Sequence, residues 1–318
     1  MIPAMGGQLV VEPARDRAGL EAVAEVKRRL TPHEPVGVAL LEHTLTSDPR
    51  TAFLVAHLDG AVAGAATARP SSQPGRLFAM VRTVPELRGR GVGSALLSSA
   101  GEHAAALGLT AIWGRVDVTD APSLRFVQRR GFAEVGREFE SQLDVSTAGP
   151  ASDPPPGVVI VSLAQRPDLA RDAYEVQRAT LPDMPSPTPP QAGSYERWRA
   201  GNLDGPGALP GGCMVALADG RTIGYAGLEG EETNPGVAEH LLTGVLREWR
   251  GRGVATALKR AQIAWARTAD IHTLVTSNDG PNDSMRAVNA GLGYRVARET
   301  VVVEAATPLE TANRRRVG

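Results

Sequence analysis

One short segment occurs twice in this sequence, about half the chain apart. Residues 88–96 read RGRGVGSAL and residues 250–258 read RGRGVATAL, an offset of 250 − 88 = 162 positions in a chain of 318 residues. The same offset continues without a gap to Gly131-Phe132 and Gly293-Tyr294. Self-similarity at a fixed offset is typical of duplicated folding units. The sequence therefore predicts two similar domains in tandem.

A stretch rich in proline, serine and glycine lies near the midpoint of the chain. Residues 146–157 read STAGPASDPPPG, with no apolar periodicity and three consecutive prolines. This composition is typical of a linker. We expect an N-terminal domain over residues 1–145, the linker over residues 146–157, a C-terminal domain over residues 158–310 and a tail over residues 311–318.

The two halves predict the same order of elements. Asp59-Gly60 and Asp219-Gly220 are hairpin signals between β runs, and each glycine segment follows a strand and opens a helix. In the first half the expected strands are residues 9–11, 51–58, 61–68, 77–84 and 109–116, and the expected helices are residues 20–30, a helix opening at residue 92, and residues 122–130. In the second half the expected strands include residues 158–161, 214–218, 222–227, 271–277 and 299–304, with a helix over residues 283–290. This order predicts the α/β class, a mixed sheet with helices on both faces.

Composition excludes several classes of protein. Hydrophobic residues make up 42% of the chain and the net charge is −1, so neither disorder nor a polybasic nucleic-acid surface is indicated. Cys213 is the only cysteine, which excludes an intrachain disulfide, and no His/Cys/Asp cluster has metal-ligand spacing. Because the sequence shows no secretory signal and no apolar run of about 18 residues, we expect a cytoplasmic protein without a membrane or nucleic-acid partner.

The repeated glycine segment has the chemistry of a phosphate site. Glycines permit positive φ and close approach of a ligand to the backbone, while the helix N-terminus adds partial positive charge. A P-loop would need a lysine that neither copy has, and a dinucleotide-binding motif would follow the first strand of its domain. A tight strand-to-helix turn is the alternative for a single copy, but the repetition in the same context favours a phosphate-bearing ligand.

These residues resemble the GNAT superfamily of acyl-CoA-dependent N-acetyltransferases. The family pattern Gln/Arg-X-X-Gly-X-Gly/Ala is similar to Arg88-X-X-Gly91-X-Gly93 and to Arg250-X-X-Gly253-X-Ala255. The resemblance covers both halves and is similar to the arrangement of tandem, mycothiol-synthase-like members, without indicating their substrate. It implies two tandem GNAT-like domains, acetyl-CoA as the acyl donor and no metal.

The resemblance also implies which residues contact the donor. The glycine loops would bind the CoA pyrophosphate through backbone N–H groups, and the ends of the preceding strands would run beside pantetheine and hold the developing oxyanion. Asn282 would hydrogen-bond the CoA arm, with a simple helix N-cap as the alternative. The implied residues are Thr243, Gly244, Val245, Arg250, Gly251, Arg252, Gly253, Val254, Ala255 and Asn282 in the second half, and Val81, Arg82, Thr83, Arg88, Gly89, Arg90, Gly91, Val92 and Gly93 in the first.

Only the second half carries a candidate base on the strand before the loop. Glu239 and His240 lie there, and subtraction of 162 places Leu77 and Phe78 at the matching positions. We therefore expect catalysis in the C-terminal half and a degenerate or purely structural N-terminal half. Adjacent strand residues face opposite sides, so at most one of the two faces the ligand, and Glu239 is preferred. The alternative is that both are polar residues at the solvent end of a strand.

One departure from the family pattern concerns the general acid. The position where many members carry a tyrosine is Val127 in one half and Asn289 in the other, and Tyr225 and Tyr294 are better interpreted as packed aromatics. The leading hypothesis is an N-acetyltransferase that acts on an amine of a small molecule or peptide. The alternative is an acyl-CoA-binding module without transferase activity. Either is compatible with a monomer or a homodimer.

Overall fold

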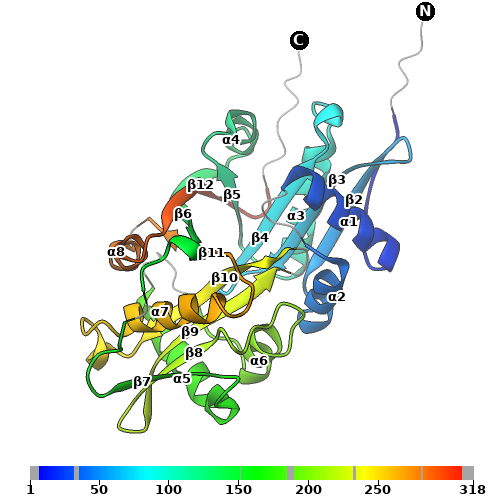
Figure 1. Ribbon diagram of the computed structural model, residues 1–318. Coiled ribbons are helices and arrows are strands. Elements are labelled where there is room, and N and C mark those ends of the chain that lie inside the picture. The colour runs from blue at the N-terminus through cyan, green and yellow to red at the C-terminus, as the bar shows by residue number, and fades with distance from the viewer. Residues whose placement is uncertain are drawn as a thin grey trace, which may run out of the picture. The chain divides into compact units, whose positions relative to one another are not determined.

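The chain folds into two compact units. The computed structural model describes residues 7–31, 36–150, 152–184, 190–231, 234–280 and 282–309. Unit 1 comprises Met1–Ser71, Gly75–Val135 and Val301–Gly318, and unit 2 comprises Ser72–Pro74 and Gly136–Thr300 (Figure 1). In the described part of the chain, no helix combines the length and the apolar character needed to cross a membrane.

Unit 1 is a mixed sheet with helices on both faces. Its strands lie in the order β1-β2-β3-β4-β5-β12, with β4 and β5 parallel. Helices α1 and α2 pack on one face around Phe53, Val55 and Ala65, and α3 packs on the other. The bounds are β1 Leu9–Pro13, α1 Arg17–Leu30, α2 Val38–Ser47, β2 Ala52–Leu58, β3 Ala61–Pro70, β4 Arg76–Thr83, α3 Val92–Ala106, β5 Ala111–Asp117, α4 Ala121–Gln128 and β12 Arg295–Ala306.

Unit 2 repeats this plan. Its strands lie in the order β6-β11-β10-β9-β8-β7, with β10 and β11 parallel. Helices α5 and α6 pack on one face around Val215 and Tyr225, and α7 packs on the other around Ile223 and Leu258 (Figure 1). The bounds are β6 Ala133–Asp144, β7 Val158–Ser162, α5 Ala170–Thr180, α6 Tyr195–Asn202, β8 Met214–Ala218, β9 Arg221–Glu231, β10 Asn234–Val245, α7 Val254–Ala266, β11 Thr273–Asp279 and α8 Asp283–Gly291.

The predicted mixed α/β class and the predicted hairpins are confirmed. Asp59 and Gly60 have φ values of 54° and 81°, and Asp219 and Gly220 have 50° and 75°, as a tight two-residue hairpin requires. Helices α2, α5 and α6 were not predicted, and the sequences of α2 and α6 lack a clear apolar stripe. The proline-rich composition of residues 182–190 predicts an irregular loop, and residues 185–189 of this segment lie outside the described residues.

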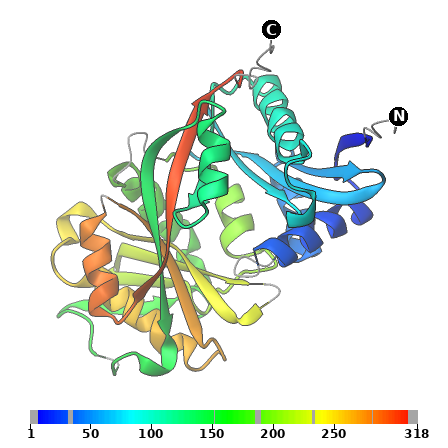
Figure 2. The same cartoon turned by 90° about the horizontal axis from the view of Figure 1, so that it is seen from above.

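Each unit contains a strand from the other half of the sequence. β6 ends the first half of the chain but pairs with β11, from Thr273↔Asp144 to Asp279↔Glu138. β12, red in Figure 2, ends the second half, and its residues from Val301 onward belong to unit 1. Burial follows the same exchange, because Val301, Val303 and Ala305 join the core of unit 1 whereas Leu143 and Val145 join that of unit 2.

Candidate active site

The two glycine loops have the same backbone conformation. Gly89 and Gly91 have φ values of 76° and 89°, and Gly251 and Gly253 have 71° and 79°. This left-handed region favours glycine because it lacks a Cβ. A Cβ built on Gly89 or Gly251 would meet no atom within 4 Å, so the backbone here lies open to a ligand.

Each loop ends at the N-terminus of a helix whose first turn has no side-chain cap. Gly91 is the N-cap of α3 and Gly253 is the N-cap of α7. The side chains of Val92 and Val254 are buried, so these residues offer only their backbone N–H groups. Uncapped N–H groups at a helix N-terminus, preceded by an open glycine turn, fit a phosphate. The donor set in both units is therefore compatible with a CoA pyrophosphate.

The strand before the loop differs between the units. In unit 1, β3 pairs with β4 without interruption from Gly64↔Thr83 to Pro70↔Leu77. In unit 2, Thr243 pairs with Ala226 and His240 pairs with Leu228, so 243 − 240 = 3 steps on β10 face 228 − 226 = 2 steps on β9. This extra residue is a β-bulge, which disrupts the ladder and leaves a residue unpaired. Only β10, of the two strands, therefore carries a bulge immediately before its glycine loop.

The bulge corrects the correspondence that a constant offset predicts. On the loop side of the bulge, Thr83 and Val245 are matched by 245 − 83 = 162. Beyond the bulge the offset between β4 and β10 is 239 − 78 = 161. Phe78 of β4 pairs with Arg69 of β3, and Glu239 occupies the same place on β10, where it pairs with Glu229 of β9. Glu239 and His240 thus match Phe78 and Ala79, and not Leu77 and Phe78. The conclusion that unit 1 has no acid or histidine at these positions is unchanged.

The two candidate bases face opposite sides of β10, as alternation along a strand requires. Glu239 is exposed, and it is the last residue of β10 that pairs with β11, opposite Val275. His240 is only 6% exposed, and its Nε2 lies 2.6 Å from Tyr294 Oη. Of the two, only Glu239 presents its side chain to solvent where the parallel pairing ends.

His240 belongs to a buried polar cluster that sequence analysis missed. Lys259 and Gln262 of α7 are 1% and 0% exposed, and Lys259 Nζ lies 5.2 Å from the centroid of the Tyr294 ring. Gln262 Nε2 donates to the Gly212 carbonyl at 3.1 Å. Burial lowers the pKa of Lys259 to about 7. Burial, reinforced by the charge of Lys259, also holds the pKa of His240 well below its ordinary value.

The two candidate asparagines and Tyr225 have structural partners. Asn282 is the N-cap of α8, and its Oδ1 accepts from the Met285 backbone N–H at 3.3 Å. Asn289, at the position of the family's tyrosine, is buried, and its Nδ2 donates to Asn278 Oδ1 at 2.6 Å. Tyr225 is fully buried, and its Oη lies 3.8 Å from Cys213 Sγ. Tyr225 and Tyr294 are thus core aromatics, as expected.

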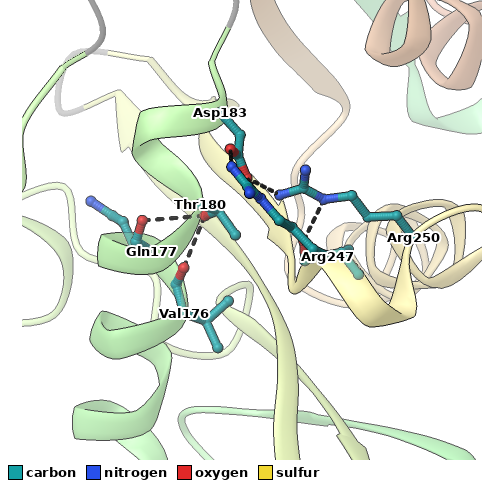
Figure 3. Close-up of polar contacts among 7 residues, drawn as sticks. Val176, Gln177, Thr180, Asp183, Arg247 and Arg250 are labelled. Carbon is teal, nitrogen blue, oxygen red and sulfur yellow. Dashed lines mark hydrogen bonds and ion pairs between the residues drawn. The ribbon is translucent and has the colours of Figure 1, made fainter.

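Arg250, the first residue of the second glycine loop, is held by an aspartate that sequence analysis also missed. Arg250 Nη2 lies 2.6 Å from Asp183 Oδ2, and Arg250 Nε donates to the Val245 carbonyl at 2.9 Å (Figure 3). Arg247 donates to the same carboxylate, with its Nε 3.0 Å from Asp183 Oδ2. Hydrogen bonds from Arg247 and then Arg250 hold the pKa of Asp183 well below its ordinary value.

In unit 1, the side chains of Arg130 and Phe126 lie against the first turn of α3. Arg130 donates to Ser94 Oγ, and its Cζ lies 3.7 Å from the centroid of the Phe126 ring. Atoms of that ring lie 3.4 Å from where a Cβ on Gly93 would be. The offset of 162 places Val288 and Leu292 at the matching positions of unit 2, and neither side chain can donate a hydrogen bond. The two loops therefore share a backbone but not their surroundings.

Comparison with known proteins identifies the family. The model of the acetyltransferase (GNAT) family matches residues 20–132 and again residues 172–294. Because these two matches span more than half of the sequence, the chain belongs to the GNAT family of acetyltransferases. It is an N-acetyltransferase by family, as the glycine loops predicted. No curated protein sequence matches the chain.

Solved structures share the tandem fold at low identity. A tandem GNAT protein from the clavulanic acid biosynthesis pathway is 21% identical, with a TM-score of 0.74 over 94% of this chain and 98% of that one. A GCN5-related N-acetyltransferase from Sphaerobacter thermophilus is 17% identical, with a TM-score of 0.73 over 94% and 95%. A putative acetyltransferase from Pyrococcus horikoshii is 12% identical, with a TM-score of 0.61 over 98% and 92%. These likenesses confirm the predicted tandem fold.

Proposed function

We propose that this protein transfers an acetyl group from acetyl-CoA to an amine of a small molecule or peptide, and that the reaction takes place in unit 2. The observation that carries the assignment to unit 2 is the position of Glu239. An exposed carboxylate lies one residue before His240 and the bulge of β10, where the pairing with β11 ends. Unit 1 has Phe78 at the matching position and an uninterrupted ladder.

Each part of unit 2 has a role in this proposal. The backbone N–H groups of Arg250–Ala255 hold the pyrophosphate of the donor at the N-terminus of α7. The backbone of Thr243, Gly244 and Val245 lies beside the pantetheine arm, and an N–H group left unpaired by the bulge polarises the thioester carbonyl. The donor supplies an activated acyl group and a thiolate leaving group, whose thiol has a pKa near roughly 8.5.

Glu239 has the task of removing a proton from the acceptor. An alkylamine has a pKa near roughly 10.4, so it is protonated at neutral pH and must lose a proton before it attacks. A carboxylate in contact with solvent accepts that proton directly or through one water molecule. His240 is not assigned this role, because its imidazole is enclosed by Tyr294 and the buried face of α7.

A second candidate function is supported by one specific observation. Neither Val127 nor Asn289 can protonate a leaving thiolate, and Asn289 is engaged by Asn278. An acyl-CoA-binding module without transferase activity would need the loops but no acid. The two functions differ in a single measurable property, the release of free CoA thiol in the presence of an amine.

The test combines binding with turnover. Calorimetric titration of the full chain with acetyl-CoA should give saturable binding, and a thiol assay across a panel of primary amines should give CoA release. Gly253→Val and Gly91→Val are the matched variants, because each replaces a left-handed N-cap glycine. We expect Gly253→Val to abolish turnover and Gly91→Val to preserve it. Binding without turnover would favour the module, and the absence of binding would contradict both functions.

A further inference from the structure

Asp183 is the one acidic residue found among the described contacts of the unit 2 loop arginines, and the family pattern does not include it. It ends the short turn Leu181–Asp183 that follows α5. Its side chain is only 15% exposed, while those of Arg247 and Arg250 are 77% and 42% exposed. The carboxylate is thus partly buried, and two more exposed guanidinium groups contact it (Figure 3).

The approach of α5 to β10 brings Asp183 to this place. Thr180, the last residue of α5, lies so close to Gly244 that a Cβ there would be 2.3 Å from Thr180 Oγ1. That hydroxyl donates to the Val176 carbonyl at 2.9 Å, within the helix. Only glycine at position 244 leaves room for this contact. The strand expected to lie along pantetheine is therefore also the strand that positions the C-terminal end of α5.

Asp183 and Arg250 together close the loop between β10 and α7. Arg250 Nε binds the carbonyl of Val245, the last residue of β10, while Arg250 Nη2 binds Asp183. The side chain thus folds back over the intervening turn Arg247–Trp249. Charge-assisted hydrogen bonds of this kind are shorter and stronger than neutral ones. They fix the residue that opens the glycine loop relative to the strand that precedes it.

The described residues of unit 1 do not provide the second arginine of this arrangement. The offset of 162 places Pro85 and Arg88 at the positions of Arg247 and Arg250, and Arg82 at that of Gly244. Arg82 Nε donates to Thr31 Oγ1 at 3.0 Å, where unit 2 has the contact between Thr180 and Gly244. Proline cannot make the ion pair that Arg247 makes. The ion pair that Arg247 makes with Asp183 is therefore specific to the unit that carries Glu239.

We infer that Asp183 is a positioning residue for the acyl donor, holding Arg250 and Arg247 so that the glycine loop of unit 2 is preformed for the pyrophosphate. This inference rests on the proposed function. The contacts that the structure gives for Asp183 are to Arg247 and Arg250, so in this inference it acts through the loop. Its loss weakens donor binding and leaves the chemical step largely intact.

Steady-state kinetics of the full chain with acetyl-CoA test this role, with Asp183→Asn as the main variant. We expect the KM for acetyl-CoA to rise at least about fivefold and kcat to change less than about twofold, because hydrogen bonds to a charged partner are lost at the loop. Asp183→Glu keeps the carboxylate and should stay within about threefold of the parent KM. Asp204→Asn, which removes an exposed ion pair with Arg199 in the same unit, is the matched control.

Several outcomes would overturn the inference. An unchanged KM for acetyl-CoA in Asp183→Asn would contradict the inference. A lower KM would also contradict it, because it would mean that the Asp183 carboxylate of the parent chain competes with phosphate. If Asp183→Asn does not fold, Arg247→Gln is tested in its place. This substitution removes one partner of Asp183 and must itself raise the KM for acetyl-CoA at least about twofold. If the parent chain binds no acetyl-CoA, the proposed function fails first. If the parent binds and Asp183→Asn binds equally, only this inference fails.

Discussion

The two units differ most clearly in the core beside β4 and β10. Four matching positions are polar in unit 2 and apolar in unit 1: His240, Lys259, Gln262 and Tyr294 against Ala79, Leu97, Ala100 and Phe132. The apolar set is an ordinary core, whereas burying polar groups with incomplete hydrogen bonding costs about 1–3 kcal/mol each. Unit 2 thus carries a stability cost next to its bulge that unit 1 does not. Departures of this kind from an ordinary core are typical of functional sites, which agrees with the proposed assignment of catalysis to unit 2.

The largest expected effect tests the contrast between Glu239 and Phe78. Glu239→Gln should lower kcat by roughly 100-fold or more, because general-base assistance contributes about 10²- to 10⁴-fold. Initial rates of thiol release with saturating acetyl-CoA and a reactive amine measure it. Glu86→Gln, an exposed acid beside the glycine loop of unit 1, should change kcat less than about twofold. Equal losses in both variants would break the assignment of catalysis to unit 2.

The next prediction concerns the buried Lys259 and the pH dependence that it gives to the free energy of unfolding. The pKa of Lys259 is about 7 in the folded chain and 10.5 when exposed, so the unfolded chain binds the extra proton between these values. The free energy of unfolding should therefore rise with pH over this window, by about 1.4 kcal/mol per pH unit, and be lowest at and below the folded pKa. Lys259→Met should remove this slope in urea denaturation at pH 7 and pH 9. Leu97→Met, at the matching position of unit 1, should cost less than about 1.5 kcal/mol and leave the slope unchanged.

A smaller effect is expected from exchanging the closing aromatics of the two units. Tyr294→Phe removes the hydroxyl that His240 Nε2 contacts and should cost about 1–3 kcal/mol in the free energy of unfolding, since a buried nitrogen loses its partner. Phe132→Tyr places a hydroxyl in the apolar core of unit 1 and should also destabilise by about 1–3 kcal/mol. Chemical denaturation of each variant measures both. A stabilising Tyr294→Phe would show that the polar cluster is not held by this contact.

The smallest effect compares one ion pair in each unit. Glu304 of β12 pairs with Arg76 in unit 1, and Glu140 of β6 pairs with Arg298 in unit 2, all four side chains being about one-fifth exposed. Glu304→Gln and Glu140→Gln should each cost roughly 1 kcal/mol or less, because screening by solvent and the desolvation of both groups offset much of the attraction. Thermal unfolding in low and high salt would detect the difference. A loss of several kcal/mol in one variant alone would show that the units rely on their pairs unequally.

Local signals in the sequence accounted for much of the fold. The glycine loops, the hairpins at Asp59 and Asp219 and the helices that follow the loops depend on the φ preferences and apolar spacing of neighbouring residues, so they were predictable. Gly131 and Gly293, which follow α4 and α8, have φ values of 78° and 96°, as glycines that end helices require, and glycine at these positions is a local signal.

Features that depend on distant contacts were not predictable. The bulge in β10 adds one residue to one strand, and only the pairing with β9 reveals it. Lys259 and Gln262 are residue types that usually lie in solvent, yet tertiary packing buries both. Asp183 lies 250 − 183 = 67 positions from Arg250 in the sequence, and no local pattern connects the two.

The exchange of β6 and β12 has a consequence for how such a gene can be divided. A break within residues 146–157 would produce two polypeptides, each bearing the strand that completes its counterpart and lacking its own. Either piece alone would expose an unpaired sheet edge, which invites aggregation. Expressed together, the pieces should restore one another and co-purify. In evolutionary terms, the duplicated halves are no longer free to separate, because each unit is completed by a strand from the other half.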